Sequence, residues 1–344
     1  MTRRLVVDLM SSAPHMQLPP WAAMRLVAAA PAGWEAVVVN SIARSVGSGT
    51  NVPSDETLMA VPNAEAYFGY GVSPQMLAAA PLLHWAHSAS AGITSSITPA
   101  LRASGVVFTN SAGVYAAAMA DTVLAGVLHF VRGLDFAVRQ QSAAVWNQRP
   151  FIGGETQLRE LNECRVLVIG AGGIGSVVAQ RFSALGCVCT GIRRRPALGI
   201  PQGFSRIAGV DALHAELPQA DIVVVAAPLT AESNNLLDTP ALSLLPSGAI
   251  VVNVARGDLV AEDALIAALD SGAVRGAVLD VFHTEPLPPE NPLWRHPCIL
   301  ITPHVSGVSP SRSWTRVLDL FEDNWRRWAS GEPLRNVVDL DAGY

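Results

Sequence analysis

The chain has 344 residues, half of them hydrophobic and only 15% charged, so it is long enough for two domains and has the material for buried cores. Its formal net charge of −5 gives no reason to expect nucleic acid or an anionic membrane as a partner. No apolar run reaches the length of a membrane span, so we expect a cytoplasmic protein.

All 23 basic residues are arginines, and the chain contains no lysine. This excludes Schiff-base chemistry and the Tyr/Lys arrangement of short-chain dehydrogenases, which both need an amine. The four cysteines, Cys164, Cys187, Cys189 and Cys298, fit neither a metal-site spacing nor a disulfide framework. We therefore expect no bound metal.

The first 110 residues alternate between short strands and helices, a pattern typical of a parallel sheet. Strands are expected at Leu5–Leu9, Val37–Asn40, Glu65–Phe68, Leu82–His87 and Val106–Thr109. Helices are expected at Ala22–Ala30, Pro74–Ala80 and Thr98–Ala103, and a polar loop at Gly47–Pro53.

Small residues follow one of these strands in the segment Ser88–Ile93. A turn of this kind can point its backbone N–H groups at an anion. A plain loop is the alternative interpretation.

A long helix is expected at Ala116–Arg132, after a hinge between domains at Gly113–Ala116. Because the helix is apolar nearly all round, it should be buried. A polar segment containing aromatic residues follows around Trp146–Thr156.

From residue 165 the chain becomes regular, with strands rich in valine, isoleucine and alanine that indicate a parallel sheet covered on both faces. Strands are expected at 165–170, 187–192, 221–226, 249–253, 276–281 and 298–302, and helices at 174–185, 262–270 and 314–329. The last helix should pack back on the first domain. The expected fold is α/β, with two doubly wound parallel-sheet domains of Rossmann or flavodoxin type. A cofactor domain, 114–308, is inserted in a discontinuous substrate domain, 1–113 and 309–344.

A glycine motif opens this second region. The apolar run from Val166 ends in the sequence Gly-Ala-Gly-Gly-Ile-Gly at 170–175, and a helical pattern follows. This strand–turn–helix context distinguishes a dinucleotide fingerprint from a chance glycine-rich turn, which is the alternative. The glycines allow a tight turn, close approach of a pyrophosphate and close helix–strand packing.

The second strand of an NAD-binding unit usually ends in an acid that binds the ribose hydroxyls. Here no Asp or Glu occurs between Gly170 and Asp211, and three arginines stand at 193–195. A guanidinium suits a bidentate contact with a 2′-phosphate. We therefore predict NADPH over NADH, with a solvated basic turn as the alternative.

Three polar residues stand where predicted strands end: Arg256, Glu285 and His304. The carboxyl ends of the strands in an open parallel sheet form the ligand crevice, so the three side chains could converge there. Reduction of a 2-oxo acid needs a cation for the carboxylate and carbonyl, a proton donor, and a carboxylate that keeps the donor charged. Each residue also has an ordinary structural interpretation when it is considered alone.

The chain resembles the D-isomer-specific 2-hydroxyacid dehydrogenase family, which includes glyoxylate/hydroxypyruvate reductases. The matching segments are 170–175, Pro228–Thr230, Asn253–Gly257, Leu279–Phe282, Glu285–Pro288 and Thr302–His304. Their order and spacing match from about residue 80 to the end, and the first 70 residues match only loosely.

The resemblance implies a role for each matching position. Arg256 would bind the substrate carboxylate and carbonyl, His304 would exchange the proton, and Glu285 would pair with His304. The backbone of Ser90, Ala91 and Gly92 would hold the substrate carboxylate. The implied cofactor ligands are Gly170, Gly172, Gly173, Ile174, Gly175, Arg193, Arg194, Pro228, Ala255 and Asp280, with Asp280 meeting the nicotinamide carboxamide. A homodimer built through the cofactor domains is also implied.

The predicted function is NADPH-dependent reduction of a small 2-oxo acid, of the glyoxylate or hydroxypyruvate type, to the D-2-hydroxy acid. One alternative on the same fold is oxidation of another small anion such as formate or phosphite. Another is a cofactor-sensing binding protein that acts like a corepressor.

Overall fold

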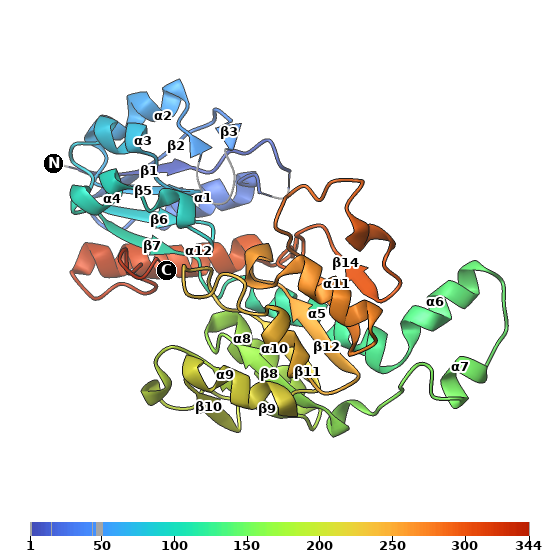
Figure 1. The fold of residues 1–344 in the computed structure, drawn as a ribbon. Helices are drawn as coiled ribbons and strands as arrows, with labels where there is room; N and C mark the ends of the chain where they lie inside the picture. The colour runs from blue at the N-terminus through green and yellow to red at the C-terminus, as the bar shows by residue number, and fades with distance from the viewer. Residues whose placement is uncertain (1, 15, 43, 46–50, 344) are drawn as a thin grey trace. The chain divides into compact units, whose positions relative to one another are not determined.

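The computed structural model describes residues 2–14, 16–42, 44–45 and 51–343. The chain forms two compact units, Met1–Tyr115 with Ser309–Tyr344, and Ala116–Val308 (Figure 1). The first unit is therefore built from both ends of the chain, and the second unit is continuous.

The first unit contains a parallel sheet in the order β2-β1-β5-β6-β7, which is the flavodoxin-like order. Its strands are β1 (Arg3–Asp8), β2 (Trp34–Val38), β5 (Ala66–Gly69), β6 (Trp85–Ser88) and β7 (Val107–Asn110). Its helices are α1 (Pro20–Ala28), α2 (Asp55–Ala60), α3 (Pro74–Ala79), α4 (Pro99–Ser104) and α12 (Ser313–Ser330).

Alternate residues of β1 point to the two faces of this sheet, as the pleat of a strand requires. Leu5 and Val7 pack with α1 and α12. Val6 lies in a separate core on the other face, with Met76 of α3 and Leu101 of α4. The sheet is thus covered on both sides.

The last helix of the chain completes the first of these cores. The ring of Phe321 stacks on Phe68 of β5, with centroids 3.9 Å apart, and on Trp85 of β6 at 5.4 Å. Trp325 has no exposed surface and meets Trp34 edge to face. The expectation that this helix packs on the N-terminal domain is confirmed.

The second unit contains a seven-stranded parallel sheet in the order β10-β9-β8-β11-β12-β13-β14. This is the Rossmann order with one strand added. Its strands are β8 (Arg165–Ile169), β9 (Val188–Ile192), β10 (Arg206–Ala208), β11 (Ile222–Val225), β12 (Ala249–Asn253), β13 (Val274–Leu279) and β14 (Ile299–Ile301). Its helices are α5 (Ala116–Val131), α6 (Leu134–Ser142), α7 (Arg149–Ile152), α8 (Gly173–Ala184), α9 (Leu213–Glu216), α10 (Thr239–Ser243) and α11 (Glu262–Asp270).

Several sequence expectations about local structure were wrong. The strand expected from Leu82 begins only at Trp85, because the chain turns after Pro81 and leaves Leu82 half exposed. Within the loop expected at Gly47–Pro53, Asn51–Val52 form β4 and pair with β3 (Arg44–Ser45), and residues 47–50 lie outside the described part of the chain.

Short elements without an apolar pattern were missed, among them α2, α9, α10 and β10. The segment after α5 also contains two helices, α6 and α7. The start of α6 is fixed by a buried ion pair, in which Arg275 of β13 donates to Asp135 at 2.8 Å. An ion-pair partner 140 positions away in the sequence cannot be recognised from a local sequence pattern.

Among the described residues no single helix is long and apolar enough to cross a membrane. The bent pair α5 and α6 passes that test together by length and composition alone. Seven residues of α5 are buried, and its Val123, Val127 and Phe130 belong to the core of the second unit.

Candidate active site

The glycine turn between β8 and α8 has the geometry of a dinucleotide-binding loop. Gly170 has φ +103°, and a Cβ there would lie 2.5 Å from the carbonyl oxygen of Ala226, so only glycine fits this position. A Cβ at Gly175 would overlap the carbonyl oxygen of Gly170. A Cβ at Gly172 would meet no atom within 4 Å. The open space therefore lies in front of the first N–H groups of α8, where a pyrophosphate would bind.

The helix that follows also suits an anion. Gly172 is the N-cap of α8 and supplies no side-chain acceptor for the first N–H groups. Those donors and the positive end of the helix dipole are available to a phosphate. Gly173 and Ile174 open the helix itself. The residues present thus fit the dinucleotide that the sequence motif implies.

Of the arginines that follow β9, Arg193 is turned back onto its own loop. Its guanidinium donates to the carbonyl oxygens of Gly199 at 2.5 Å and Pro196 at 3.4 Å. Arg194 and Arg195 are exposed. Both hydrogen bonds come from Nη2, so they leave Arg193 Nη1 out of the loop contact, and the roles of Arg193 and Arg194 toward a 2′-phosphate stay predictions.

Arg256 follows directly on the turn that ends β12. The buried Asn253 shapes this turn: its Nδ2 donates to the Arg256 carbonyl at 2.8 Å, and its Oδ1 accepts from Ala255 N at 3.1 Å. The Arg256 side chain is partly buried, and Nη1 donates to the Ala255 carbonyl at 2.6 Å. Burial lowers the pKa of the guanidinium, and the carboxylate of Glu285 opposes that shift. Arg256 and Glu285 therefore lie within electrostatic reach of each other.

His304 and Glu285 form an ion pair across two turns at the carboxyl ends of β13 and β14. His304 Nδ1 lies 2.7 Å from Glu285 Oε2. The other carboxylate oxygen, Oε1, accepts from Phe282 N at 3.0 Å, which fixes its orientation. With Nδ1 turned to the carboxylate, Nε2 is the ring nitrogen that can face a substrate.

Asp280 holds the segment that carries His304. Its carboxylate has no exposed surface and accepts from Thr302 Oγ1 at 2.6 Å, Val305 N at 2.8 Å, and both the N–H and the hydroxyl of Ser306. Its carbonyl accepts from His304 N at 2.9 Å. These bonds sustain the left-handed backbone of His304, at φ +53°. The role that the resemblance implies for Asp280, a contact with the nicotinamide carboxamide, stays a prediction.

The predicted substrate loop lies in the first unit, after β6. Each carbonyl oxygen from residue 89 to 91 accepts a hydrogen bond: Ala89 from Tyr115 OH at 2.7 Å, Ser90 from Ser111 N at 3.1 Å, and Ala91 from Asn110 Nδ2 at 2.9 Å. In a trans peptide the N–H points opposite to the C=O. The N–H groups of Ala91 and Gly92 therefore point away from these donors, as an anion site would require.

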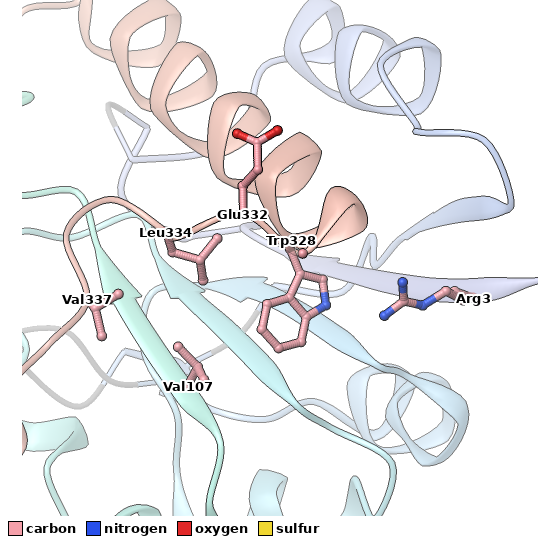
Figure 2. Close-up of a pocket in the computed structure, with 7 residues that line it drawn as sticks. Arg3, Val107, Trp328, Glu332, Leu334 and Val337 are labelled. Atoms are coloured by element: carbon pink, nitrogen blue, oxygen red, sulfur yellow. The ribbon is translucent and has the colours of Figure 1, made fainter.

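A hollow elsewhere in the first unit is not part of this arrangement. It encloses about 380 Å³ and is lined by Arg3, Val107, Trp328, Gly331, Glu332, Leu334 and Val337 (Figure 2). Arg3 and Val107 are the first residues of β1 and β7, so the hollow lies at the amino ends of these strands, opposite the loop at Ser90. Within the described ranges, no cluster of three or more His, Cys, Asp or Glu residues is placed to hold a metal ion.

Comparison with known proteins assigns the chain to a family. Residues 124–306 match the model of the D-isomer specific 2-hydroxyacid dehydrogenase NAD binding domain, which covers Arg256, Glu285 and His304. The chain belongs to this family. It is accordingly an NAD(P)-dependent 2-hydroxyacid dehydrogenase or reductase, with the two-domain Rossmann-like fold that the sequence predicted.

The names and structures of individual relatives agree with this family assignment. A glyoxylate/hydroxypyruvate reductase A from Salmonella newport (strain SL254) is 35% identical over 228 residues, which are 66% of this chain and 69% of the relative. A D-isomer specific 2-hydroxyacid dehydrogenase from Xanthobacter autotrophicus Py2, solved with NADPH and MES, is 30% identical, with a TM-score of 0.79 and full coverage of both chains. An NADPH-dependent glyoxylate/hydroxypyruvate reductase from Sinorhizobium meliloti shares the fold at 24% identity, with a TM-score of 0.77 over 99% of this chain and 100% of that one.

The structure adds residues that the sequence reasoning did not single out. Asn253 shapes the Arg256 turn, and Asn110 and Tyr115 orient the Ser90 loop. Of these, Asn253 carried a usable signal, since a polar residue that ends a run of buried β-residues needs hydrogen-bond partners. Asn110 and Tyr115 carried none.

Proposed function

We propose that this dehydrogenase reduces a small 2-oxo acid, glyoxylate or hydroxypyruvate first, with NADPH, to the D-2-hydroxy acid. The observation that carries the proposal is the His304–Glu285 ion pair at 2.7 Å, with Arg256 within electrostatic reach of the same carboxylate. When bound, the reduced nicotinamide supplies a hydride. The chain itself has to bind the acid, orient its carbonyl and deliver a proton.

Each of the three residues suits one of these tasks. Arg256 carries a fixed charge and a planar fork that matches a carboxylate or polarises a carbonyl. His304 can donate a proton from Nε2 to the carbonyl oxygen as it becomes a hydroxyl. Glu285 contacts the other ring nitrogen, Nδ1, and so holds the imidazole in place for the transfer.

The same pair argues against oxidation of formate. Oxidation of formate to carbon dioxide leaves no hydroxyl proton to manage, so a carboxylate beside the histidine would have no task. Reduction of a carbonyl needs a proton that is held and delivered at one atom. The Glu285–His304 pair is therefore better suited to a 2-oxo acid.

A preference for NADPH is part of the proposal. It is supported by the absence of an acid after β9, by the exposed Arg194, and by the NADPH in the Xanthobacter relative. Replacing Arg194 with serine should lower kcat/KM for NADPH about tenfold or more and leave the value for NADH unchanged, because one charged phosphate contact is lost. Equal or better kcat/KM with NADH in the wild type would contradict this preference.

We also propose that the active form is a homodimer joined through α6 and α7. These helices stand apart from the sheet of the second unit (Figure 1). The two helices and the segment between them expose apolar side chains: Leu134, Val138, Val145, Trp146 and Ile152, with Trp146 90% exposed. Several exposed apolar side chains within one short segment are typical of an interface.

The deciding experiment follows NADPH oxidation against a panel of 2-oxo acids, with formate and phosphite assayed in the opposite direction. We expect activity with glyoxylate and hydroxypyruvate. His304→Gln should abolish turnover and leave NADPH binding nearly unchanged, and His296→Gln should leave both unchanged. An absence of turnover with every 2-oxo acid would overturn the proposal, and retained kcat in His304→Gln would remove that residue from the mechanism.

A further inference from the structure

A second histidine–carboxylate group joins the turn that carries Arg256 to the turn that carries Glu285. His283 Nδ1 contacts Asp258 Oδ1, and His283 N donates to Glu262 Oε1 at 3.0 Å. Asp258 lies two positions after Arg256, and His283 lies two positions before Glu285. We refer to Asp258, Glu262 and His283 as the clasp.

The two turns are in direct backbone contact at the clasp. A Cβ on Gly257 would overlap the carbonyl carbon of Phe282 and the amide nitrogen of His283, so no side chain fits between them. Phe282 N donates to Glu285 Oε1 at 3.0 Å. A shift of either turn is therefore transmitted to Arg256 on one side and to the Glu285–His304 pair on the other.

The fold itself does not require this group. The side chain of His283 is 70% exposed and that of Asp258 is 32% exposed, and exposed ion pairs contribute little to stability. A comparable pair in the same unit, His296 with Asp270 at 3.3 Å, lies before β14 and at the end of α11. It touches neither turn, which makes Asp270 a matched control.

We propose that the clasp is a protonation-dependent positioning device that sets how Arg256 presents its guanidinium to the substrate carboxylate. This rests on the proposed function. Histidine changes charge between about pH 5 and 8. The charged groups that face His283 are the carboxylates of Asp258 and Glu262 from the Arg256 side. On its own segment, Glu285 follows two positions later and pairs with His304.

Protonated His283 attracts Asp258 more strongly than neutral His283 does. The Arg256 turn is then held most firmly at low pH, and substrate affinity is highest there. His283 and Asp258 touch neither substrate nor cofactor in this proposal, so they act on KM more than on kcat. The pH dependence of KM thus separates the clasp from His304, which acts on kcat.

The test is steady-state reduction of glyoxylate by the wild type and by His283→Gln, Asp258→Asn, the double variant and Asp270→Asn. At about pH 6 we expect each clasp variant to raise KM about three- to fivefold, with kcat within about twofold and melting temperature unchanged. The double variant should show no further increase, because the two residues act as one unit. Asp270→Asn should match the wild type throughout.

The decisive readout is the ratio of KM in His283→Gln to KM in the wild type as pH rises. We expect it to fall toward one as pH rises from about 6 to 8.5, because a histidine side chain loses its charge with rising pH; effects of His304 cancel in the ratio. A ratio that is one at every pH, or raised equally at every pH, would overturn the clasp while the wild type and Asp270→Asn still reduce glyoxylate. An inactive wild type would overturn the proposed function and the clasp with it.

Discussion

Replacing Asp280 with asparagine should lower both the stability of the protein and kcat, and should leave NADPH binding unchanged. Asp280 accepts from four donor groups: Thr302 Oγ1, Val305 N, and the N–H and hydroxyl of Ser306. An amide keeps the shape of the carboxylate but removes its charge and turns one acceptor into a donor. The gentler orientation puts the amide nitrogen at the Oδ2 position, where the Ser306 hydroxyl can rotate to accept. The Ser306 N–H, which lies 3.1 Å from both carboxylate oxygens, then keeps only its bond to Oδ1.

The loss in free energy of unfolding caused by Asp280→Asn follows from the hydrogen bonds that remain. Hydrogen bonds to a charged acceptor contribute about 1.5–3 kcal/mol and neutral ones about 0.5–1.5 kcal/mol, a difference of about 1 kcal/mol each. Three donors stay on Oδ1, from Thr302, Val305 and Ser306. We therefore expect the free energy of unfolding to fall by about 3 kcal/mol. Because the same bonds hold the His304 backbone, kcat should fall about 10- to 100-fold, as expected when a catalytic group is displaced by about 1 Å.

The assay combines urea unfolding, kcat for glyoxylate and the Kd of NADPH. Asp221→Asn is the matched control, because Asp221 also accepts from Arg159 Nη1 at 2.9 Å and Arg165 N at 2.8 Å but at the amino ends of the strands. It should lose stability and keep kcat. Asp280→Asn should lose kcat and keep the Kd of NADPH. If the Kd of NADPH rises with little loss of kcat, Asp280 contacts the nicotinamide and the reasoning is wrong.

Three further outcomes are expected. Gly172→Ala should leave the melting temperature nearly unchanged, because its Cβ meets no atom within 4 Å, and should raise the Kd of NADPH about tenfold or more by entering the pyrophosphate space; unchanged NADPH titration would contradict this. Burial lowers the pKa of His87 to about 3 from 6.5, so between these values only the unfolded chain takes up the proton and stability falls as pH falls. Urea unfolding should show a loss of about 2 kcal/mol from pH 7 to 5 that is absent in His87→Gln, and parallel curves would refute it. Val138→Asp, on the exposed side of α6, should give monomers in analytical ultracentrifugation, and an unchanged mass would exclude this surface as the interface.

The parts of the fold that could be predicted are those whose signal is carried by consecutive residues. All residues of β11 and β12 are buried, and their near-continuous valine and isoleucine marked them as central strands. The strand β10, with only Arg206–Ala208, is an edge strand too short for any periodicity. The start of α6 depends on Asp135 meeting Arg275, which no local pattern contains.

The candidate site divides in the same way. Arg256 and His304 could be located because each follows a recognisable strand, and their chemistry is fixed by residue type. The contacts that orient the residues of the site could not be located from the sequence. The bonds of Asp280 to the 302–306 segment, the clasp, and the turn of Arg193 onto its own loop all depend on side-chain directions after folding. The sequence therefore predicted which groups react, and the structure shows what orients them.

The packing of α12 has a consequence for biosynthesis. Phe321 and Trp325 fill the core between β5, β6 and α1, yet they follow the whole second unit in the chain. Domains generally fold as units while synthesis proceeds from the N-terminus. The second unit can thus mature on the ribosome before the first one has received the aromatic rings that close its core. Until then Phe68 and Trp85 lack their stacking partner, so the oldest part of the nascent chain is the last to become resistant to proteases and aggregation.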